Sequence, residues 1–213
     1  MPTQEDYLTA LAIAREECAE KDPRVQAGRS GALWTPSGTG SGGAGVAEVR
    51  FLATPYLIRC PGGDVAYRAK SEKEPALWEQ ILLLHYFNTA DGTPLSGHWI
   101  SVKEIPDSRL YLPIFDKRAV APLLGRFGTD PNRAREAARS IGGRDADGGD
   151  VGVTVPVFPR VPVTILFWKA DEEFSPRVQI LFDRTIVRYL PTEDIILTSQ
   201  MLAFRLIALA GQG

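Results

Sequence analysis

The pattern of apolar and polar positions predicts helices at both ends of the chain and in its middle. Residues 4–20 carry apolar side chains at helical spacing, and these form one stripe: Tyr7, Leu11, Ala14 and Cys18. Thr3, followed three positions later by Asp6, is typical of a capping box at the start of that helix. Residues 74–87 are apolar around most of a helical circumference, so we expect this helix in the core.

Three later segments also have helical patterns. Residues 114–127 form the first, in which Pro122 must kink or divide the helix because proline lacks a backbone N–H. Residues 130–142 form the second, and residues 193–210 the third, with Thr192 expected as its N-cap.

Alternation with a period of two predicts strands between the helices. The stretches interpreted as strands, most of them with this pattern, are 46–60, which contains two short strands, 64–70, 99–105, 151–159, 161–168 and 177–183. The turn sequence PGGD joins the early stretches into an antiparallel meander. Residues 161–168 are apolar at nearly every position, so they are expected in the middle of a sheet. The sequence therefore predicts an α+β fold, a mostly antiparallel sheet with helices packed on it.

Glycine and serine dominate residues 28–45, and a segment of this composition buries too little apolar surface to order itself. We therefore expect one domain over residues 1–213 with a mobile loop at about 28–45. Trp34 is the exception in this loop. It either anchors the loop on the domain surface, which we favour, or lies over a ligand.

Composition narrows the class of protein. The formal net charge is −2, which gives no field attracting nucleic acid or an anionic membrane. No secretion signal and no apolar span of membrane length occur, so we expect a cytoplasmic protein. The two cysteines, Cys18 and Cys60, lack zinc-ligand spacing and a redox motif, and we expect them to be buried thiols.

Nucleotide-binding and serine-hydrolase motifs are absent from the sequence, so the catalytic residues, if any, are unknown. The chain has two histidines. His85 lies within the helix predicted at 74–87 and is expected to be a core residue. His98 lies where a loop enters a strand and is the better functional candidate.

The most acidic segment is WKADEEFSPRVQILFD, which contains Asp171, Glu172, Glu173 and Asp183. Carboxylates grouped at the end of a buried strand offer oxygen ligands to a hard cation, or raise one another's pKa for acid–base chemistry. The simpler interpretation is a hairpin turn with solvated charges. For the segment YLPTED, which begins at Tyr189, the simpler interpretation is the start of a helix.

Three segments of this sequence together resemble a known family, domain of unknown function 3786: HYFNTADGTPLSGHWISVKEIPDSRLYLPIFDKRAVAPLLGRFG, VPVTILFWKADEEFSPRVQILFD and YLPTEDI. The resemblance covers roughly residues 45–205. It implies a setting in anaerobic bacteria and archaea, in one-carbon, corrinoid or redox metabolism, where some members carry an iron–sulfur domain. This chain lacks the cysteines that a cluster needs.

The resemblance and the aromatic residues beside loops lead to one main hypothesis, a non-catalytic module that binds a small-molecule ligand, for example a tetrapyrrole such as a corrinoid or haem. The residues expected to bind it are His98, Trp99, His85, Trp168, Phe174 and Tyr189. A histidine would supply an axial nitrogen to the metal. Two alternatives stay open: a metal-dependent enzyme that uses Asp171, Glu172 and Glu173, and an interaction domain with a redox or one-carbon protein partner.

Overall fold

The computed structural model describes residues 3–37, 43–69 and 72–211. The chain forms two compact units. The first comprises Met1–Pro94, Phe158–Arg160 and Arg188–Pro191, and the second comprises Leu95–Val157, Val161–Val187 and Thr192–Gly213. That these units act as a single domain stays a prediction.

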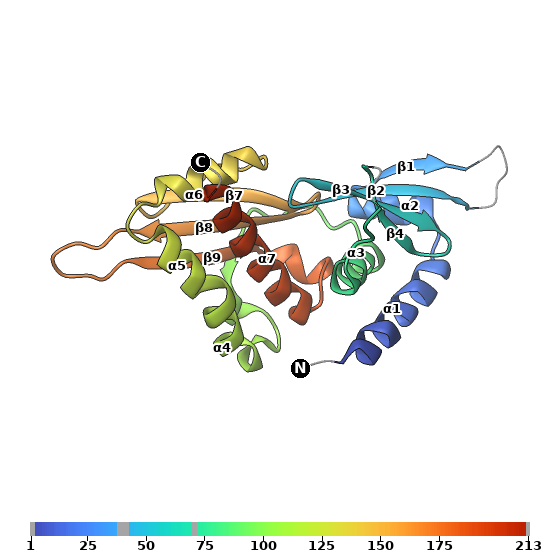
Figure 1. Ribbon diagram of the computed structural model, residues 1–213, viewed down its shortest axis with the longest axis horizontal. Coiled ribbons are helices and arrows are strands. Elements are labelled where there is room, and N and C mark those ends of the chain that lie inside the picture. Colours follow the sequence, from blue (N-terminus) through green and yellow to red (C-terminus); the bar gives the residue numbers. More distant parts are fainter. Residues whose placement is uncertain (1–2, 38–42, 70–71, 212–213) are drawn as a thin grey trace. The chain divides into compact units, whose positions relative to one another are not determined.

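The first unit contains a four-stranded antiparallel meander in the order β1-β2-β3-β4 and three helices (Figure 1). The strands are β1 (Leu33–Pro36), β2 (Gly45–Phe51), β3 (Thr54–Cys60) and β4 (Asp64–Tyr67). The helices are α1 (Gln4–Ala19), α2 (Pro23–Ser30) and α3 (Leu77–Thr89), and α3 packs against α1 and α2. The predicted meander and the capping box of Thr3 and Asp6 are confirmed.

An aromatic stack forms part of the core of the first unit. Phe158 lies with its ring centroid 4.1 Å from that of Tyr86 on α3 and 4.8 Å from that of Phe51 on β2. The backbone N–H of Arg160 donates to the Tyr86 hydroxyl at 3.1 Å. These contacts explain why a short segment distant in sequence belongs to this unit.

The segment predicted as a mobile loop, 28–45, contains regular structure at both ends, and residues 38–42 lie outside the described residues. Helix α2 extends into it and ends at Gly31, whose positive φ of 72° closes the helix. Trp34 lies on β1 opposite Ala47, and a Cβ at Gly45 would overlap its ring. Trp34 therefore anchors this segment on its own sheet, which is the interpretation we favoured.

The second unit contains a sheet with strand order β5-β9-β8-β7-β6. The strands are β5 (Trp99–Ser101), β6 (Arg144–Asp145), β7 (Val151–Phe158), β8 (Val161–Trp168) and β9 (Arg177–Asp183). The helices are α4 (Leu112–Phe115), α5 (Ala121–Phe127), α6 (Asn132–Ser140) and α7 (Thr192–Ala210). With two antiparallel sheets and helices packed on them, the α+β fold is confirmed.

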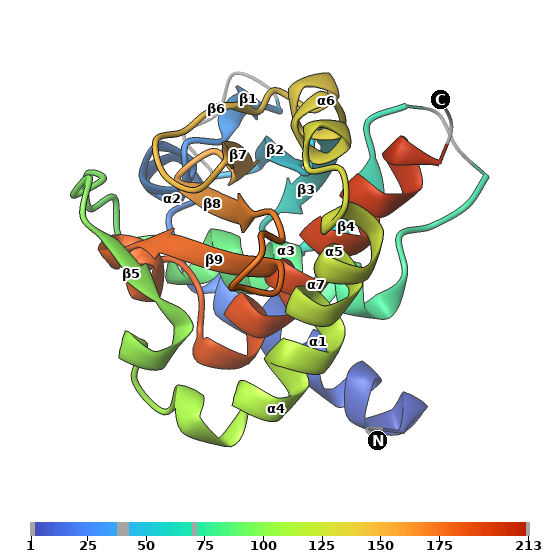
Figure 2. The same cartoon turned by 90° about the vertical axis from the view of Figure 1, so that its left-hand side faces the viewer.

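Helices cover one face of this sheet. Figure 2 shows α4, α5 and α7 gathered on one side of β8 and β9. The buried side chains on that face are Val163, Ile165 and Phe167 on β8, opposite Phe182, Ile180 and Val178 on β9. Phe127 of α5 meets Phe167 edge to face, with ring centroids 6.1 Å apart. Strand β8 therefore lies in mid-sheet, as its apolar sequence predicts.

The predicted helix 114–127 is divided. A π-helical turn over Asp116–Val120 separates α4 from α5, and Pro122 lies in the first turn of α5, directly after it. Its missing N–H leaves a gap in the helical hydrogen bonds at this point. Helix α3 begins at Leu77, two residues after Pro75, because the Glu79 carboxylate accepts the Ala76 N–H at 2.8 Å and fixes the start there.

Candidate functional site

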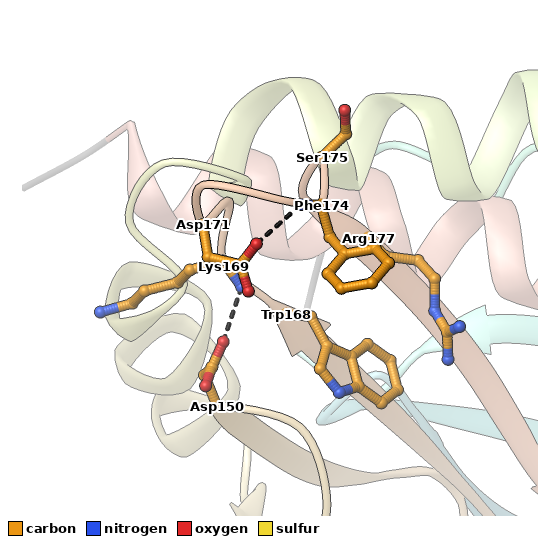
Figure 3. A pocket seen from close by; sticks show the side chains of 7 residues that line it. All are labelled: Asp150, Trp168, Lys169, Asp171, Phe174, Ser175 and Arg177. Atoms are coloured by element: carbon orange, nitrogen blue, oxygen red, sulfur yellow. Dashed lines mark hydrogen bonds between the residues drawn. The ribbon is translucent and has the colours of Figure 1, made fainter.

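A pocket of about 300 Å³ lies where β8 ends and β9 begins (Figure 3). Its lining residues come from the end of β8, the connection 169–176, the start of β9 and the loop before β7: Asp150, Trp168, Lys169, Asp171, Phe174, Ser175 and Arg177. This volume is at the lower end of the range of small-molecule sites, which begins at about 300 Å³.

The antiparallel register places Trp168 directly opposite Arg177. The guanidinium carbon of Arg177 lies 4.2 Å from the centroid of the Trp168 ring. This cation–π contact contributes about 0.5–1 kcal/mol at a partly exposed site, so it favours this arrangement of the two side chains before any ligand binds. Trp168 is half-buried and Arg177 is exposed, so the pair is accessible at the pocket.

A tight turn presents Phe174. One carboxylate oxygen of Asp171 accepts the backbone N–H of Glu173 at 2.9 Å and that of Phe174 at 2.6 Å. The Asp171 N–H in turn donates to the Phe174 carbonyl at 3.0 Å. Short polar side chains that bind backbone two residues ahead favour such turns. The turn leaves Phe174 with 69% of its surface exposed beside the pocket.

A second carboxylate fixes the opposite side of the pocket. Asp150 accepts the Lys169 backbone N–H at 2.7 Å, and its own N–H donates to the Phe167 carbonyl at 2.8 Å. These bonds fasten the loop before β7 to the end of β8. Asp150 and Asp171 each use one oxygen in this way, and within the described chain the second oxygen of each has no hydrogen bond.

The pocket therefore combines two aromatic faces, two cations and two carboxylate oxygens able to accept hydrogen bonds. Stacking on the aromatic faces suits a flat ring, and Lys169 and Arg177 suit an anionic substituent on it. Ser175 is the one hydroxyl in the lining, and neither histidine lines the pocket. The arrangement suits the binding of a small molecule.

Residues 22–205 of the chain match the model of one protein family, which is described as Domain of unknown function (DUF3786). The chain belongs to this family. The resemblance seen in the sequence is thereby confirmed, and the match begins before the Gly/Ser-rich segment. No curated protein and no solved structure matches the chain. Within the described ranges of this DUF3786 chain, no helix has the length and apolar character needed to cross a membrane.

The four carboxylates predicted as metal ligands do not assemble in this DUF3786 chain. Asp171 closes the turn, and Glu172 and Glu173 are exposed beside it. Asp183 lies at the other end of β9. Across residues 3–37, 43–69 and 72–211, no group of three or more His, Cys, Asp or Glu side chains is able to hold a metal ion.

Asp183 has a different environment from that of the acidic turn. Only 2% of it is exposed, and its carboxylate accepts hydrogen bonds from the backbone and hydroxyl of both Ser96 and Thr185 and from the backbone of Gly97. Burial by itself raises the pKa of Asp183, but the hydrogen bonds from Thr185 and Ser96 outweigh it and lower the pKa below the ordinary value. Asp183 thus fastens the loop before β5 to the end of β9.

Of the six residues expected to bind a ligand, the structure brings together Trp168 and Phe174. His98 is exposed and Trp99 is half-buried at the start of β5, where Trp99 pairs with Asp183 at the far end of β9 from the pocket. The other two residues belong to the first unit.

His85 is half-buried on α3 and is engaged in an interaction there. Tyr189 is fully buried, its ring centroid lies 6.2 Å from that of Tyr86, and its hydroxyl donates to the Thr93 carbonyl. Both side chains therefore serve the packing of the first unit.

Sequence reasoning missed Arg177, Lys169 and Asp150. The signal for Arg177 was available, because a hairpin whose connection is 169–176 pairs the residues on either side of it. Asp150 reaches the pocket from a separate loop, and no local sequence pattern predicts this position.

Proposed function

We propose that this DUF3786 chain is a binding module for a flat, ring-shaped small molecule. The observation that supports this most is the pairing of a Trp168 ring, held by Arg177, with a Phe174 side chain that is 69% exposed at the same pocket. A ring stacked on these side chains would remove their apolar surface from water, which stabilises a complex by about 25 cal/mol for each Å² buried.

The polar lining narrows the ligand class. Lys169 and Arg177 favour a carboxylate or phosphate substituent, since both side chains carry a full positive charge. The second oxygens of Asp150 and Asp171 favour N–H donors on the ring. The ligand proposed is therefore a nitrogen-containing flat ring with an anionic substituent.

A tetrapyrrole, corrinoid or haem, matches the nitrogen-containing ring and the anionic substituent of this class, but its ring nitrogens are bound to the metal and donate no hydrogen bond. It is the ligand that the metabolic setting implied by the family resemblance suggests. A pocket of about 300 Å³ would receive one edge of the macrocycle, and the rest would extend into solvent. His98 lies at the far end of β9, so pocket residues would hold the ring by stacking and charge, without an axial histidine. A role in anaerobic one-carbon or redox metabolism is part of this proposal.

Titration of the purified protein with haem, cobalamin and flavin mononucleotide, followed by visible absorbance and tryptophan fluorescence, tests the proposal. Phe174→Ser is the test variant, and Phe204→Ser, at a residue 45% exposed on α7, is the matched control. We expect Phe174→Ser to weaken binding about 5- to 100-fold, the usual effect of losing one stacked aromatic ring. The control should bind as tightly as the wild type.

Failure of all three compounds to bind would refute the proposed ligand class. Equal binding by Phe174→Ser and Phe204→Ser would place the ligand elsewhere. Of the two alternatives, a metal-dependent enzyme would use Asp171, Glu172 and Glu173, but one oxygen of Asp171 binds the backbone of its own turn and, among the described residues, the three side chains form no group able to hold a metal ion. An interaction domain would show a stable protein partner together with a negative result for all three compounds.

A further inference from the structure

The first unit contains a second pocket, of about 370 Å³. It lies among α1, the turn between β3 and β4, and the residues before α3. Its charged lining residues are Arg15, Arg59, Lys73, Asp64 and Glu74, and Tyr67 and Gln80 are among the others. Three cations face two carboxylates, so the lining carries an excess of positive charge.

The guanidinium of Arg15 is held at this pocket by two partners. Its Nη2 lies 3.2 Å from the Asp64 carboxylate and 3.5 Å from the Gln80 side-chain oxygen. Gln80 is itself fixed, since it is 6% exposed and its Nε2 donates to the Pro75 carbonyl at 2.9 Å. The arginine is therefore oriented before any ligand binds.

Gly63 makes room for this arginine. A Cβ at Gly63 would lie 3.0 Å from Cγ and 3.2 Å from Cα of Arg15, and the φ of Gly63 is +69°. A residue with a side chain would meet both a close contact and a strained backbone there. The turn between β3 and β4 thus permits the close approach that brings α1 to the pocket.

One donor of Arg15 is left without an acceptor. Its Nε is buried from solvent and, in the part of the chain that the structure describes, makes no hydrogen bond. Because water does not reach Nε, a ligand oxygen in the pocket does not reach it either. The terminal nitrogen Nη1 is not buried and, among the described residues, makes no hydrogen bond, so it is the donor of Arg15 that a ligand in the pocket would meet.

Arg59 adds a second positive charge beside it. In the β3–β4 ladder Arg59 is the direct partner of Asp64, and the two side chains are neighbours on one face of the sheet. Asp64 forms its ion pair with Arg15. For the described residues no ion pair or hydrogen bond of the Arg59 side chain is found, so its donors are available to an anion.

We propose that this pocket binds a small oxyanion, a phosphate group, for which Nη1 of the oriented Arg15 guanidinium is the donor and Arg59 and Lys73 provide the surrounding charge. Arginine pairs well with phosphate oxygens because its planar donors match their geometry. The site shares no residue with the pocket of the second unit, so an experiment can refute the phosphate site without refuting the proposed function, and the reverse.

Isothermal titration with inorganic phosphate at constant ionic strength tests this, with acetate as the carboxylate arm. We expect phosphate to bind more tightly than acetate. Arg59→Gln should weaken phosphate binding about tenfold, whereas Arg50→Gln, at an exposed arginine of β2 outside the pocket, should leave it unchanged. Preference for acetate would assign the site to carboxylates and overturn the phosphate assignment.

Arg15→Lys tests the oriented donor, because it keeps the charge and removes the planar guanidinium. This variant should bind phosphate at least tenfold more weakly, with a circular dichroism spectrum equal to that of the wild type. Absence of phosphate binding by the wild type would overturn the proposal. So would equal weakening by Arg59→Gln and Arg50→Gln, or phosphate binding by a folded Arg15→Lys variant as tight as that of the wild type.

Discussion

Asp183→Asn should destabilise the protein by about 3 kcal/mol, although it changes the side chain by a single atom. One oxygen of Asp183 accepts four hydrogen bonds, from the backbone and hydroxyl of Ser96 and of Thr185, at 2.7–3.1 Å. The other oxygen accepts the Gly97 N–H at 2.7 Å. In asparagine the amide oxygen would keep the first set, and the amide NH₂ would face the Gly97 N–H, donor against donor.

The magnitude follows from these bonds. A hydrogen bond to a charged acceptor contributes about 1.5–3 kcal/mol and a bond between neutral groups about 0.5–1.5 kcal/mol, so loss of the charge weakens four bonds and removes the fifth. Because Asp183 is 2% exposed, water does not replace the lost acceptor. For a chain of 213 residues, 3 kcal/mol corresponds to a fall in Tm of about 6–12 °C.

The stabilisation by Asp183 should also depend on pH with a defined sign. Its pKa is lowered in the folded state, because the hydrogen bonds from Thr185 and Ser96 outweigh the effect of burial. The stabilisation is therefore fully present above the unfolded pKa of about 3.9 and is lost as the pH falls through the lower folded pKa. The difference in stability between wild type and Asp183→Asn should be largest at neutral pH and shrink below about pH 4.

Urea unfolding at pH 7 and at pH 3, followed by tryptophan fluorescence, measures both effects. Asp147→Asn, at an exposed aspartate of the loop before β7, is the matched control and should change the free energy of unfolding by less than about 0.5 kcal/mol. If Asp183→Asn at pH 7 matched this control, or if its deficit were as large at pH 3 as at pH 7, the hydrogen-bond argument would be refuted.

Two further predictions concern the first unit. Gln26→Ala should lower the free energy of unfolding by about 2 kcal/mol, because Gln26 is 3% exposed and its Nε2 donates to the carbonyls of Phe87, Asn88 and Ala90 at the end of α3. Urea unfolding measures this against the exposed control Gln4→Ala. Equal stability of the two variants would contradict the prediction. Cys18 and Cys60 are free and buried, and the hydrogen bond that the Cys60 thiol donates to Cys18, together with burial, raises the pKa of the Cys60 thiol. Because both thiols are buried, iodoacetamide should label them slowly in the native protein and rapidly in urea, and fast labelling of the native protein would contradict the burial.

The elements that the sequence predicts correctly are those determined by interactions between residues close together in the chain. The capping box of Thr3 and Asp6 lies within four residues, and the alternation that includes Val49 and Phe51 lies on one strand. Strand β1 was missed because its cause is not local. Its composition indicates a loop, and it is ordered by pairing with β2 across the Gly-rich connection.

The same distinction applies to the candidate site. Asp171 and Asp183 lie twelve positions apart in one acidic segment, and the sequence alone gives no reason to treat them differently. In the structure Asp183 meets donors that come from Ser96 and Gly97, more than eighty residues earlier, whereas Asp171 binds the backbone of its own turn. Tertiary contacts therefore divide one sequence cluster into two unrelated roles.

This division explains why the candidate site consists mainly of the aromatic residues of the β8–β9 hairpin. The carboxylates of the hairpin contribute less to it. Both carboxylates at the pocket hold backbone N–H groups, so their positions follow from the turns that they close. No such structural need accounts for Phe174, which keeps 69% of its surface in water when the turn could close as well with a polar residue. A ring stacked on Phe174 and on the neighbouring Trp168–Arg177 pair would remove this apolar surface from water, so the hairpin is the first place to look for the proposed ligand.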